Sequence, residues 1–420
     1  MKNEFSRRNF LRTSLYTAGA AGAAIQLGAG QALAQAPMQV KAPAVELPPV
    51  INLGANTLSI GPSAKALEAI GKYAVKAGGY GGRESGELVE TIAKQLGVPT
   101  DHIAVYPGSG TPLDLVTVAF TGPGKPLVTA DVTYEQAWRT SARVGAKLTK
   151  VNQRKDYSHD VEGMVKAEAA PGMIYICNPN NPTGGINLRK DIEFAAKNKP
   201  KGSVLVVDEA YIHFSDNATT AADLVNTIED VIVLRTFSKL YGMAGLRLGY
   251  AVASPENLVK MNGGSGRSQG IVAMTTIGAG IASLTDAELV PSRRAMIKAG
   301  RTETVKWLEK QGYACSKSEA NCFLVDVKSP GREFQAALAT HGVNIGRTWV
   351  GYENWPRVSV GTEAEMARFR EAFAAVKAGK MGSIEPQTRQ RASLELPGAT
   401  LQRASFMNGV DGLMALQGSY

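Results

Sequence analysis

The sequence predicts an α/β protein with a mostly parallel sheet covered by helices on both faces, together with a smaller α+β domain. Between residues 86 and 286, short apolar runs rich in β-branched residues alternate with helical patterns, as in repeated parallel strand–helix units. Polar motifs follow several of these runs, where ligands bind in such sheets. From about Ala287 onward, one long helical pattern leads into alternating strands and helices, which indicates the second domain.

The individual elements follow from local periodicity and capping signals. A helix is expected over 63–76 with Ser63 as its N-cap, because serine accepts hydrogen bonds from the first free backbone N–H groups. Further helices of the large domain are expected at 87–96, 114–120, 135–143 and 188–197, and its strands at 103–106, 126–129, 173–177, 204–207, 231–234 and 248–252. The smaller domain is expected to contain helices 287–311, 333–341 and 363–378 and strands 323–327 and 357–360.

Composition excludes several classes of protein. The 420 residues are 44% hydrophobic and 20% charged, which is ordinary for a globular chain large enough for more than one domain. The formal charge is +9, but no basic patch with interleaved aromatic residues indicates nucleic-acid binding. The three cysteines and four histidines lack the spacing of a disulfide framework or a metal site, so no metal is expected. A bridge between Cys315 and Cys322 stays open.

The N-terminus has the features of an export signal. Residues 6–12 read Ser-Arg-Arg-Asn-Phe-Leu-Arg, which resembles the twin-arginine motif, and an uncharged stretch over 13–30 follows. Residues 32–34, Ala-Leu-Ala, offer the small side chains that signal peptidase requires. We therefore expect the twin-arginine machinery to export the folded protein to the periplasm. Cleavage near Ala34 would leave no stable membrane anchor.

Three motifs carry chemistry. They are Asn-Pro-Asn-Asn-Pro-Thr-Gly at 178–184, Val-Val-Asp-Glu-Ala-Tyr at 206–211, and Thr-Phe-Ser-Lys at 236–239 with Arg247 eight residues after the lysine. A lysine can form a Schiff base with an aldehyde, and an aspartate can pair with a pyridinium nitrogen. Hydroxyls and an arginine can hold a phosphate. Together these groups supply what a pyridoxal 5′-phosphate (PLP) site requires.

On these motifs, residues from about Pro48 to Gly379 resemble the fold-type I PLP enzymes of aminotransferase class I and II, and the histidinol-phosphate aminotransferase branch most closely. The resemblance implies the PLP-transferase fold with a seven-stranded, mostly parallel sheet. It also implies a homodimer with a shared active site. The expected activity is transamination between an amino acid, or a related amine, and a 2-oxo acid by way of a Lys239 Schiff base.

The resemblance also implies the role of each site residue. Lys239 would carry the Schiff base and then the proton, and Asp208 would pair with the ring nitrogen. The other cofactor contacts are expected from the phosphate ligands Gly110, Thr111, Thr236, Ser238 and Arg247, from the ring contacts Tyr134, Asn181 and Tyr211, and from Tyr80 of the neighbouring subunit. Arg357 would grip the substrate's acidic group. Arg347 is either a second anion contact or a rim charge.

The same resemblance divides the chain into parts. Residues 1–34 form the export signal, 35–85 an N-terminal arm and part of the small domain, 86–286 the large PLP-binding domain, 287–380 the small domain and 381–420 a polar tail. Three segments depart from the histidinol-phosphate branch, and one of them is the unusually Gly-rich segment 262–270. Residues 54–57 lack a glutamate and a proline, and Pro112-Leu113 replaces an Asp-Glu pair. Because these positions border the substrate pocket in that branch, the departures argue against histidinol phosphate as substrate.

Two alternatives to transamination share the same cofactor. A PLP-dependent decarboxylase, lyase or oxygen-using oxidase would use the same lysine and aspartate, because the outcome depends on which substrate bond is broken. A PLP- or ligand-binding protein without turnover is the second alternative. The presence of Lys239, Asp208 and Arg247 together argues against it.

Overall fold

The computed structural model describes residues 49–264, 271–380 and 382. The expected export signal, most of the N-terminal arm and nearly all of the C-terminal tail lie outside these residues. Within the described part of the chain, no helix is both long enough and apolar enough to cross a membrane. Cys177, Cys315 and Cys322 are free, so the structure contains no bridge between Cys315 and Cys322.

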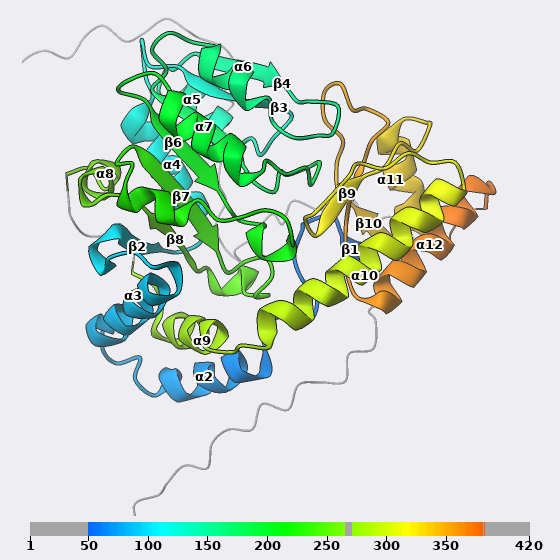
Figure 1. Ribbon diagram of the computed structural model, residues 1–420. Helices are drawn as coiled ribbons and strands as arrows, with labels where there is room; N and C mark the ends of the chain where they lie inside the picture. The colour runs from blue at the N-terminus through cyan, green and yellow to red at the C-terminus, as the bar shows by residue number, and fades with distance from the viewer. Residues whose placement is uncertain (1–48, 265–270, 381, 383–420) are drawn as a thin grey trace, which may run out of the picture. The chain divides into compact units, whose positions relative to one another are not determined.

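A seven-stranded sheet forms the centre of the larger lobe (Figure 1). Its strand order is β2–β8–β7–β6–β5–β3–β4, and β8 alone runs antiparallel to its neighbours. The strands are β2 (Ile103–Tyr106), β3 (Leu127–Asp131), β4 (Leu148–Asn152), β5 (Met173–Cys177), β6 (Val204–Asp208), β7 (Val231–Thr236) and β8 (Gly249–Val252). The expected mostly parallel sheet is confirmed. Within this sheet, β4 is the strand that had no counterpart among the expected strands.

Helices cover both faces of this sheet because the central strands are apolar on both sides. In β5, Ile174 and Ile176 face one core cluster, whereas Tyr175 and Cys177 face the other. The first face is covered by α3 (Gly82–Leu96), α6 (Val161–Lys166), α7 (Arg189–Asn198) and α9 (Met274–Leu284). The second face is covered by α4 (Gly110–Phe120), α5 (Gln136–Arg143) and α8 (Pro255–Met261). Short 3₁₀ helices lie at Thr100–His102, Ile212–Phe214, Ala222–Asn226 and Ala244–Leu246.

The smaller lobe has its own core. Phe373 lies at its centre, with its ring edge-on to the rings of Tyr313 and Phe334, each 4.9 Å away between centroids. The elements are α10 (Leu289–Lys310), β9 (Cys322–Leu324), α11 (Gly331–Thr340), β10 (Val343–Ile345), β11 (Arg357–Ser359) and α12 (Glu363–Lys377). Strand β11 pairs with β9, and β10 pairs with β1 (Ile51–Leu53) from the start of the described chain.

The segment before residue 86 contributes to both lobes. Strand β1 belongs with the smaller lobe through β10, whereas α2 (Ala64–Ala74) packs against α9 of the larger lobe (Figure 1). Ser63 is the N-cap of α2 and accepts a hydrogen bond from the Ala66 N–H, as expected. The chain therefore passes between the lobes at residues 54–62, which places this segment beside the strand ends where polar motifs gather.

Candidate active site

Ten of the thirteen predicted site residues meet in one cavity of about 380 Å³ beyond the carboxyl ends of the parallel strands. Asp208 is the last residue of β6 and Thr236 the last of β7, and Lys239 follows β7 directly. The predicted residues that line this cavity are Gly110, Tyr134, Asn181, Asp208, Tyr211, Thr236, Ser238, Lys239, Arg247 and Arg357. The ends of strands β6, β7, β8 and β11 thus bring a lysine, an aspartate and two arginines into one cavity.

Lys239 has an amine with altered basicity. Burial, followed by the positive charge of Arg357, lowers the pKa of its Nζ to about 8, while Cys322 and Asp208 act in the opposite direction. The Nζ lies 5.5 Å from the centroid of the Tyr211 ring. A lysine with a pKa near 8 is neutral often enough at physiological pH to act as a nucleophile or a base.

Asp208 is a buried carboxylate with two hydrogen-bond donors. Its Oδ2 accepts from the Tyr175 hydroxyl at 2.9 Å, and its Oδ1 accepts from the Ala210 N–H at 3.1 Å. Burial raises its pKa to about 6, against the opposing effects of these donors and of Lys239. Among the described residues, no cationic side chain lies within salt-bridge distance of it. This carboxylate is therefore suited to pairing with a cation bound in the cavity.

An anion-binding cup lies at the other end of the cavity. Helix α4 begins at Gly110, and the side chain of its N-cap Ser109 makes no capping hydrogen bond. A Cβ atom at Gly108 would lie 2.3 Å from Nη2 of Arg247, so glycine at this position leaves room for the guanidinium group. The hydroxyls of Thr236 and Ser238 lie 2.9 Å apart at the same cavity. A helix N-terminus, two hydroxyls and a guanidinium group form a site for a phosphate.

Arg357 connects the two lobes at this cavity. Its Nη1 donates to Asn181 Oδ1 at 2.7 Å, and its Nη2 donates to the Gly54 carbonyl at 2.6 Å. Its Nε is buried and has no hydrogen-bond partner among the described residues. Each of the two Nη atoms thus retains a second N–H for a further acceptor. Asn181 gives its oxygen to Arg357, which leaves its amide N–H groups for the cavity.

Arg347 lines an adjoining cavity instead. This second cavity, of about 240 Å³, shares Tyr134, Asn181 and Arg357 with the first. Arg347 pairs with Glu135 at 2.5 Å, and its Cζ lies 4.4 Å from the centroid of the Trp349 ring. The structure therefore places Arg347 beside the adjoining cavity as a paired, half-exposed charge, apart from Lys239.

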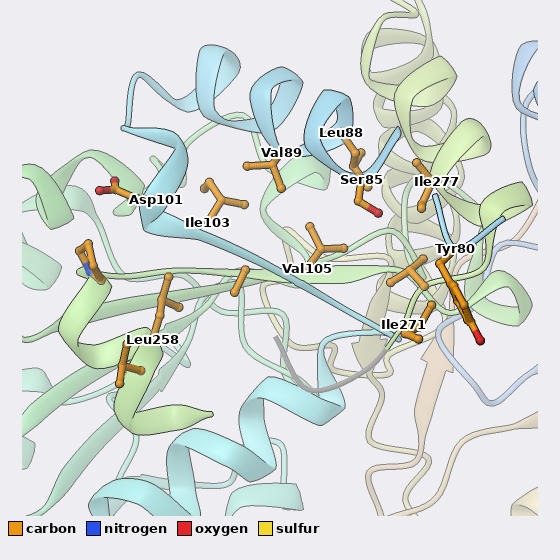
Figure 2. Close-up of a pocket in the computed structure, with 14 residues that line it drawn as sticks. Tyr80, Ser85, Leu88, Val89, Asp101, Ile103, Val105, Leu258, Ile271 and Ile277 are labelled. Carbon is orange, nitrogen blue, oxygen red and sulfur yellow. The ribbon is translucent and has the colours of Figure 1, made fainter. Parts of the chain in front are cut away.

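Two predicted residues lie outside the cavity lining. Thr111 follows Gly110 in α4 but does not line the cavity. Tyr80 is 88% exposed and lines a separate, mostly apolar cavity of about 500 Å³. Figure 2 shows Tyr80 at one end of that cavity beside Ile271, with Asp101 at the other end. In this chain alone, Tyr80 therefore contributes nothing to the cavity of Lys239.

Other lining residues were indicated only by segment or not at all. Ala55 and Thr57, from the segment expected to border the substrate pocket, reach the cavity between the lobes, whereas Gln136, which no sequence pattern had indicated, does so from α5. Gln136 Nε2 donates to the Gly110 carbonyl at 2.8 Å, while its Oε1 accepts from the Tyr134 hydroxyl at 3.0 Å. Glutamine is not a typical catalytic residue type, so only its position two residues after Tyr134 could have indicated its place.

The family of the chain follows from comparison with known proteins. The family described as aminotransferase class I and II matches residues 48–373, which is most of the chain and includes every element of the cavity. The chain belongs to this family. It is a PLP-dependent aminotransferase of fold type I, and the expected fold, cofactor and transaminase activity are confirmed. No finding favours a decarboxylase, a lyase, an oxidase or a binding protein without turnover.

Individual relatives are similar over most of the chain. A histidinol-phosphate aminotransferase of Symbiobacterium thermophilum is 30% identical over 78% of this chain and 90% of the relative. An aromatic amino acid aminotransferase of Rhodococcus erythropolis is 31% identical over 81% and 94%. The crystal structure of a histidinol-phosphate aminotransferase from Sinorhizobium meliloti, in complex with pyridoxal-5′-phosphate, has a TM-score of 0.71 at 26% identity. It covers 78% of this chain and 91% of its own.

The cavity of this aminotransferase fits its cofactor. The groups that PLP presents are a phosphate, a protonated ring nitrogen, a ring oxygen and an aldehyde. The cavity offers the anion cup at Arg247, the buried carboxylate of Asp208, the hydroxyl of Tyr211 with the amide of Asn181, and the amine of Lys239. Among these features, the one that indicates a phosphate most specifically is the Arg247 guanidinium group, for which Gly108 leaves space.

Proposed function

We propose that this aminotransferase takes its amino group from an amino acid with a planar, aromatic side chain and transfers it to a 2-oxo acid. The observation that carries the proposal is the pair of joined cavities. Lys239 and Arg357 line the first, and Trp349 lines the second. Tyr134, Asn181 and Arg357 line both. An amino acid held by its acid group at Arg357 can place its nitrogen near Lys239 and its side chain beside Trp349.

The cofactor would be held at four points. Arg247, Ser238 and the N-terminus of α4 would hold its phosphate, with Thr236 supporting Ser238. The carboxylate of Asp208 would keep the ring nitrogen protonated. In that state PLP, when bound, supplies an electron sink for the carbanion formed at the substrate Cα. The Tyr211 hydroxyl and the Asn181 amide would donate to the ring oxygen, and Tyr134 would stack on the ring.

Lys239 would move the proton. With a pKa of about 8, its Nζ is partly neutral at physiological pH and can accept the proton from the substrate Cα. The same nitrogen would then deliver that proton to the cofactor carbon that receives the amino group. Arg357 would have two roles. Its positive charge lowers the pKa of Lys239, and the remaining N–H groups of its guanidinium group would donate to the substrate carboxylate.

The side-chain preference follows from the charges around the second cavity. Three arginines line it, but the Arg347 and Arg139 guanidinium groups lie 2.5 and 3.7 Å from the Glu135 carboxylate. Arg347 also covers one face of the Trp349 ring. Glu135 thus occupies the Arg347 guanidinium group that a second substrate acid group would need. The resemblance to an aromatic amino acid aminotransferase at 31% identity supports the same preference.

Spectroscopy tests the reaction and the donor class together. Amino acids are added one at a time to the cofactor-loaded protein without an acceptor, and the visible absorbance is followed. Aromatic donors are expected to remove the long-wavelength band and a 2-oxo acid to restore it, whereas Lys239→Ala should show neither change. If no amino acid perturbs the band, the proposed donor class is wrong.

Glu135 offers a sharper test of the side-chain cavity. Glu135→Gln should free Arg347, so kcat/KM for aspartate relative to phenylalanine is expected to rise at least about tenfold, the value of one charge-assisted hydrogen bond. Glu193→Gln, at an exposed helix pair with Arg189, is the matched control and should leave the ratio unchanged. An unchanged ratio in Glu135→Gln would remove the Glu135–Arg347 pair from substrate selection.

We also propose that the enzyme is a homodimer in which Tyr80 reaches the phosphate of the neighbouring subunit. Two large side chains exposed at the same cavity support the proposal: Tyr80 is 88% exposed and Ile271 72% (Figure 2). Mixing the inactive variants Tyr80→Ala and Lys239→Ala should restore activity, because one site of each hybrid dimer then has both residues. No recovery on mixing, despite exchange of subunits, would place the function of Tyr80 elsewhere.

Export by the twin-arginine route is the remaining part of the proposal. It rests on the Arg-Arg pair at residues 7–8, the uncharged stretch and the Ala-Leu-Ala site before residue 35. Cell fractionation of the full chain should find the mature enzyme in the periplasm with its cofactor bound. The double variant Arg7→Lys/Arg8→Lys should retain it in the cytoplasm, and unchanged export of that variant would contradict the route.

A further inference from the structure

Asn56 is a buried polar residue that makes hydrogen bonds to residues of both lobes. It is 1% exposed, and its φ of 52° lies in the left-handed region, which asparagine tolerates better than most residues. Its backbone N–H donates to Ser359 Oγ at 2.9 Å, and Ser359 Oγ donates to its Oδ1 at 2.8 Å. Its backbone carbonyl accepts from Asn321 Nδ2 at 3.2 Å. Each polar atom of this residue is therefore used.

The amide nitrogen of Asn56 faces the active site. Nδ2 donates to the Tyr211 hydroxyl oxygen at 3.2 Å and to Cys322 Sγ at 3.2 Å. The neighbouring contact determines this orientation. Cys322 donates its S–H to the Pro182 carbonyl, so its sulfur can only accept from Asn56. The group of Asn56 that faces Cys322 and Tyr211 is therefore the NH₂ and not the oxygen.

This arrangement leaves the Tyr211 hydrogen free. The Tyr211 oxygen accepts from Asn56, and no other hydrogen-bond partner of the hydroxyl occurs among the described residues. Burial raises the pKa of Tyr211 well above its ordinary value, so the hydroxyl keeps its proton. Tyr211 lines the cavity, whereas Asn56 does not. The hydroxyl hydrogen is thus available to an acceptor inside the cavity.

We propose that Asn56 is a positioning residue that, by donating to the Tyr211 oxygen, directs the Tyr211 hydrogen toward the cofactor's ring oxygen. The inference rests on the proposed role of Tyr211. As a consequence, a residue outside the cavity would help to set the pKa of the bound cofactor. Because Asn56 also contacts Ser359 and Cys322 of the smaller lobe, the position of that lobe is coupled to the direction of the Tyr211 hydroxyl.

The test is a pH titration of the visible absorbance of the cofactor-loaded protein. Asn56→Asp keeps the shape and the left-handed backbone but replaces the donor with an acceptor, which turns the Tyr211 hydrogen away from the cavity. The ring oxygen loses a hydrogen-bond donor and a negative charge is added nearby. Both changes should raise the pH midpoint of the absorbance titration, by about one pH unit or more. Asn52→Asp is the matched control, because its exposed Oδ1 only accepts from the Gly54 N–H. It should leave the midpoint unchanged.

Two further variants separate this inference from the proposed function. Asn56→Gly permits the same φ and removes the amide without adding charge, so its midpoint should also rise. In a Tyr211→Phe background, Asn56→Gly should have no further effect. If Tyr211→Phe itself leaves the midpoint unchanged, the proposed role of Tyr211 fails. If Tyr211→Phe raises the midpoint but Asn56→Asp and Asn56→Gly do not, the positioning role of Asn56 is overturned and that of Tyr211 stands.

Discussion

The pKa of Lys239 makes the rate of cofactor loading a direct test of the site. A pKa of about 8 in place of 10.5 makes the neutral amine roughly 300 times more abundant at pH 7. This advantage shrinks as the pH rises toward 10.5. Relative to a lysine of ordinary pKa, the reactivity of Lys239 toward an aldehyde should therefore fall roughly 25-fold between pH 7 and pH 9.5.

Stopped-flow absorbance measures this ratio. Apoenzyme and, separately, Nα-acetyllysine are mixed with PLP across the pH range, and the quotient of the two rates removes the cofactor's own titration. Lys239→Ala reports the contribution of the other lysines. Arg357→Gln should move the inflection to higher pH, because the guanidinium charge is the largest charge effect that lowers the Lys239 pKa. A quotient that stays constant with pH would refute the argument.

Two substitutions test the anion-binding cup and the buried ion pair between Glu209 and Arg235. Gly108→Ala should weaken PLP binding about 10- to 100-fold by equilibrium dialysis, because its Cβ displaces the Arg247 guanidinium group; Gly124→Ala, also at positive φ but in open space, should leave the dissociation constant unchanged. Glu209→Gln should lower the free energy of unfolding by about 3–5 kcal/mol in urea, because Arg235, 2.8 Å away, is left as a buried unpaired charge. Glu68→Gln at an exposed helix pair should not change the urea midpoint.

Most of the larger lobe was predictable because its central strands are apolar on both faces. Strands β2 and β5 match the expected ranges at both ends, since turn residues bound each run. Strand β4 escaped prediction because it is an edge strand, and its Leu-Thr-Lys-Val-Asn sequence is half-exposed and polar. Helix α9 was missed for the opposite reason. Most of its residues are buried, so its sequence has no polar face to reveal a helical period.

Site residues were predictable where the reaction requires one particular residue type. They were not predictable where a residue belongs to the site only because the fold places it there. Lysine, aspartate and arginine after apolar strands indicate a cofactor site from the sequence, and the fold brings them into one cavity. Trp349 gave no such signal, and Asn56 was indicated only as part of the segment 54–57 that was expected to border the substrate pocket. Asn56 acquires its partners only when β1 joins β10 and brings Ser359, 303 residues away in sequence, into contact. Trp349 enters the second cavity from a loop of the smaller lobe.

The pKa values of Asp208 and Lys239 together make the apoenzyme dependent on its cofactor. The pKa of Asp208 is raised from 3.8 to about 6, so its cost to folding grows as the pH rises to 6 and is complete above that. The pKa of Lys239 is lowered from 10.5 to about 8, so its cost is complete below pH 8 and disappears toward 10.5. Between pH 6 and 8 the apoenzyme bears both costs. Binding of PLP would remove them, because Asp208 would then pair with the ring nitrogen and Lys239 would be held by the aldehyde. The difference in Tm between loaded and apoenzyme should therefore be largest between pH 6 and 8, and a difference that grows steadily on either side of this window would contradict the origin assigned to it.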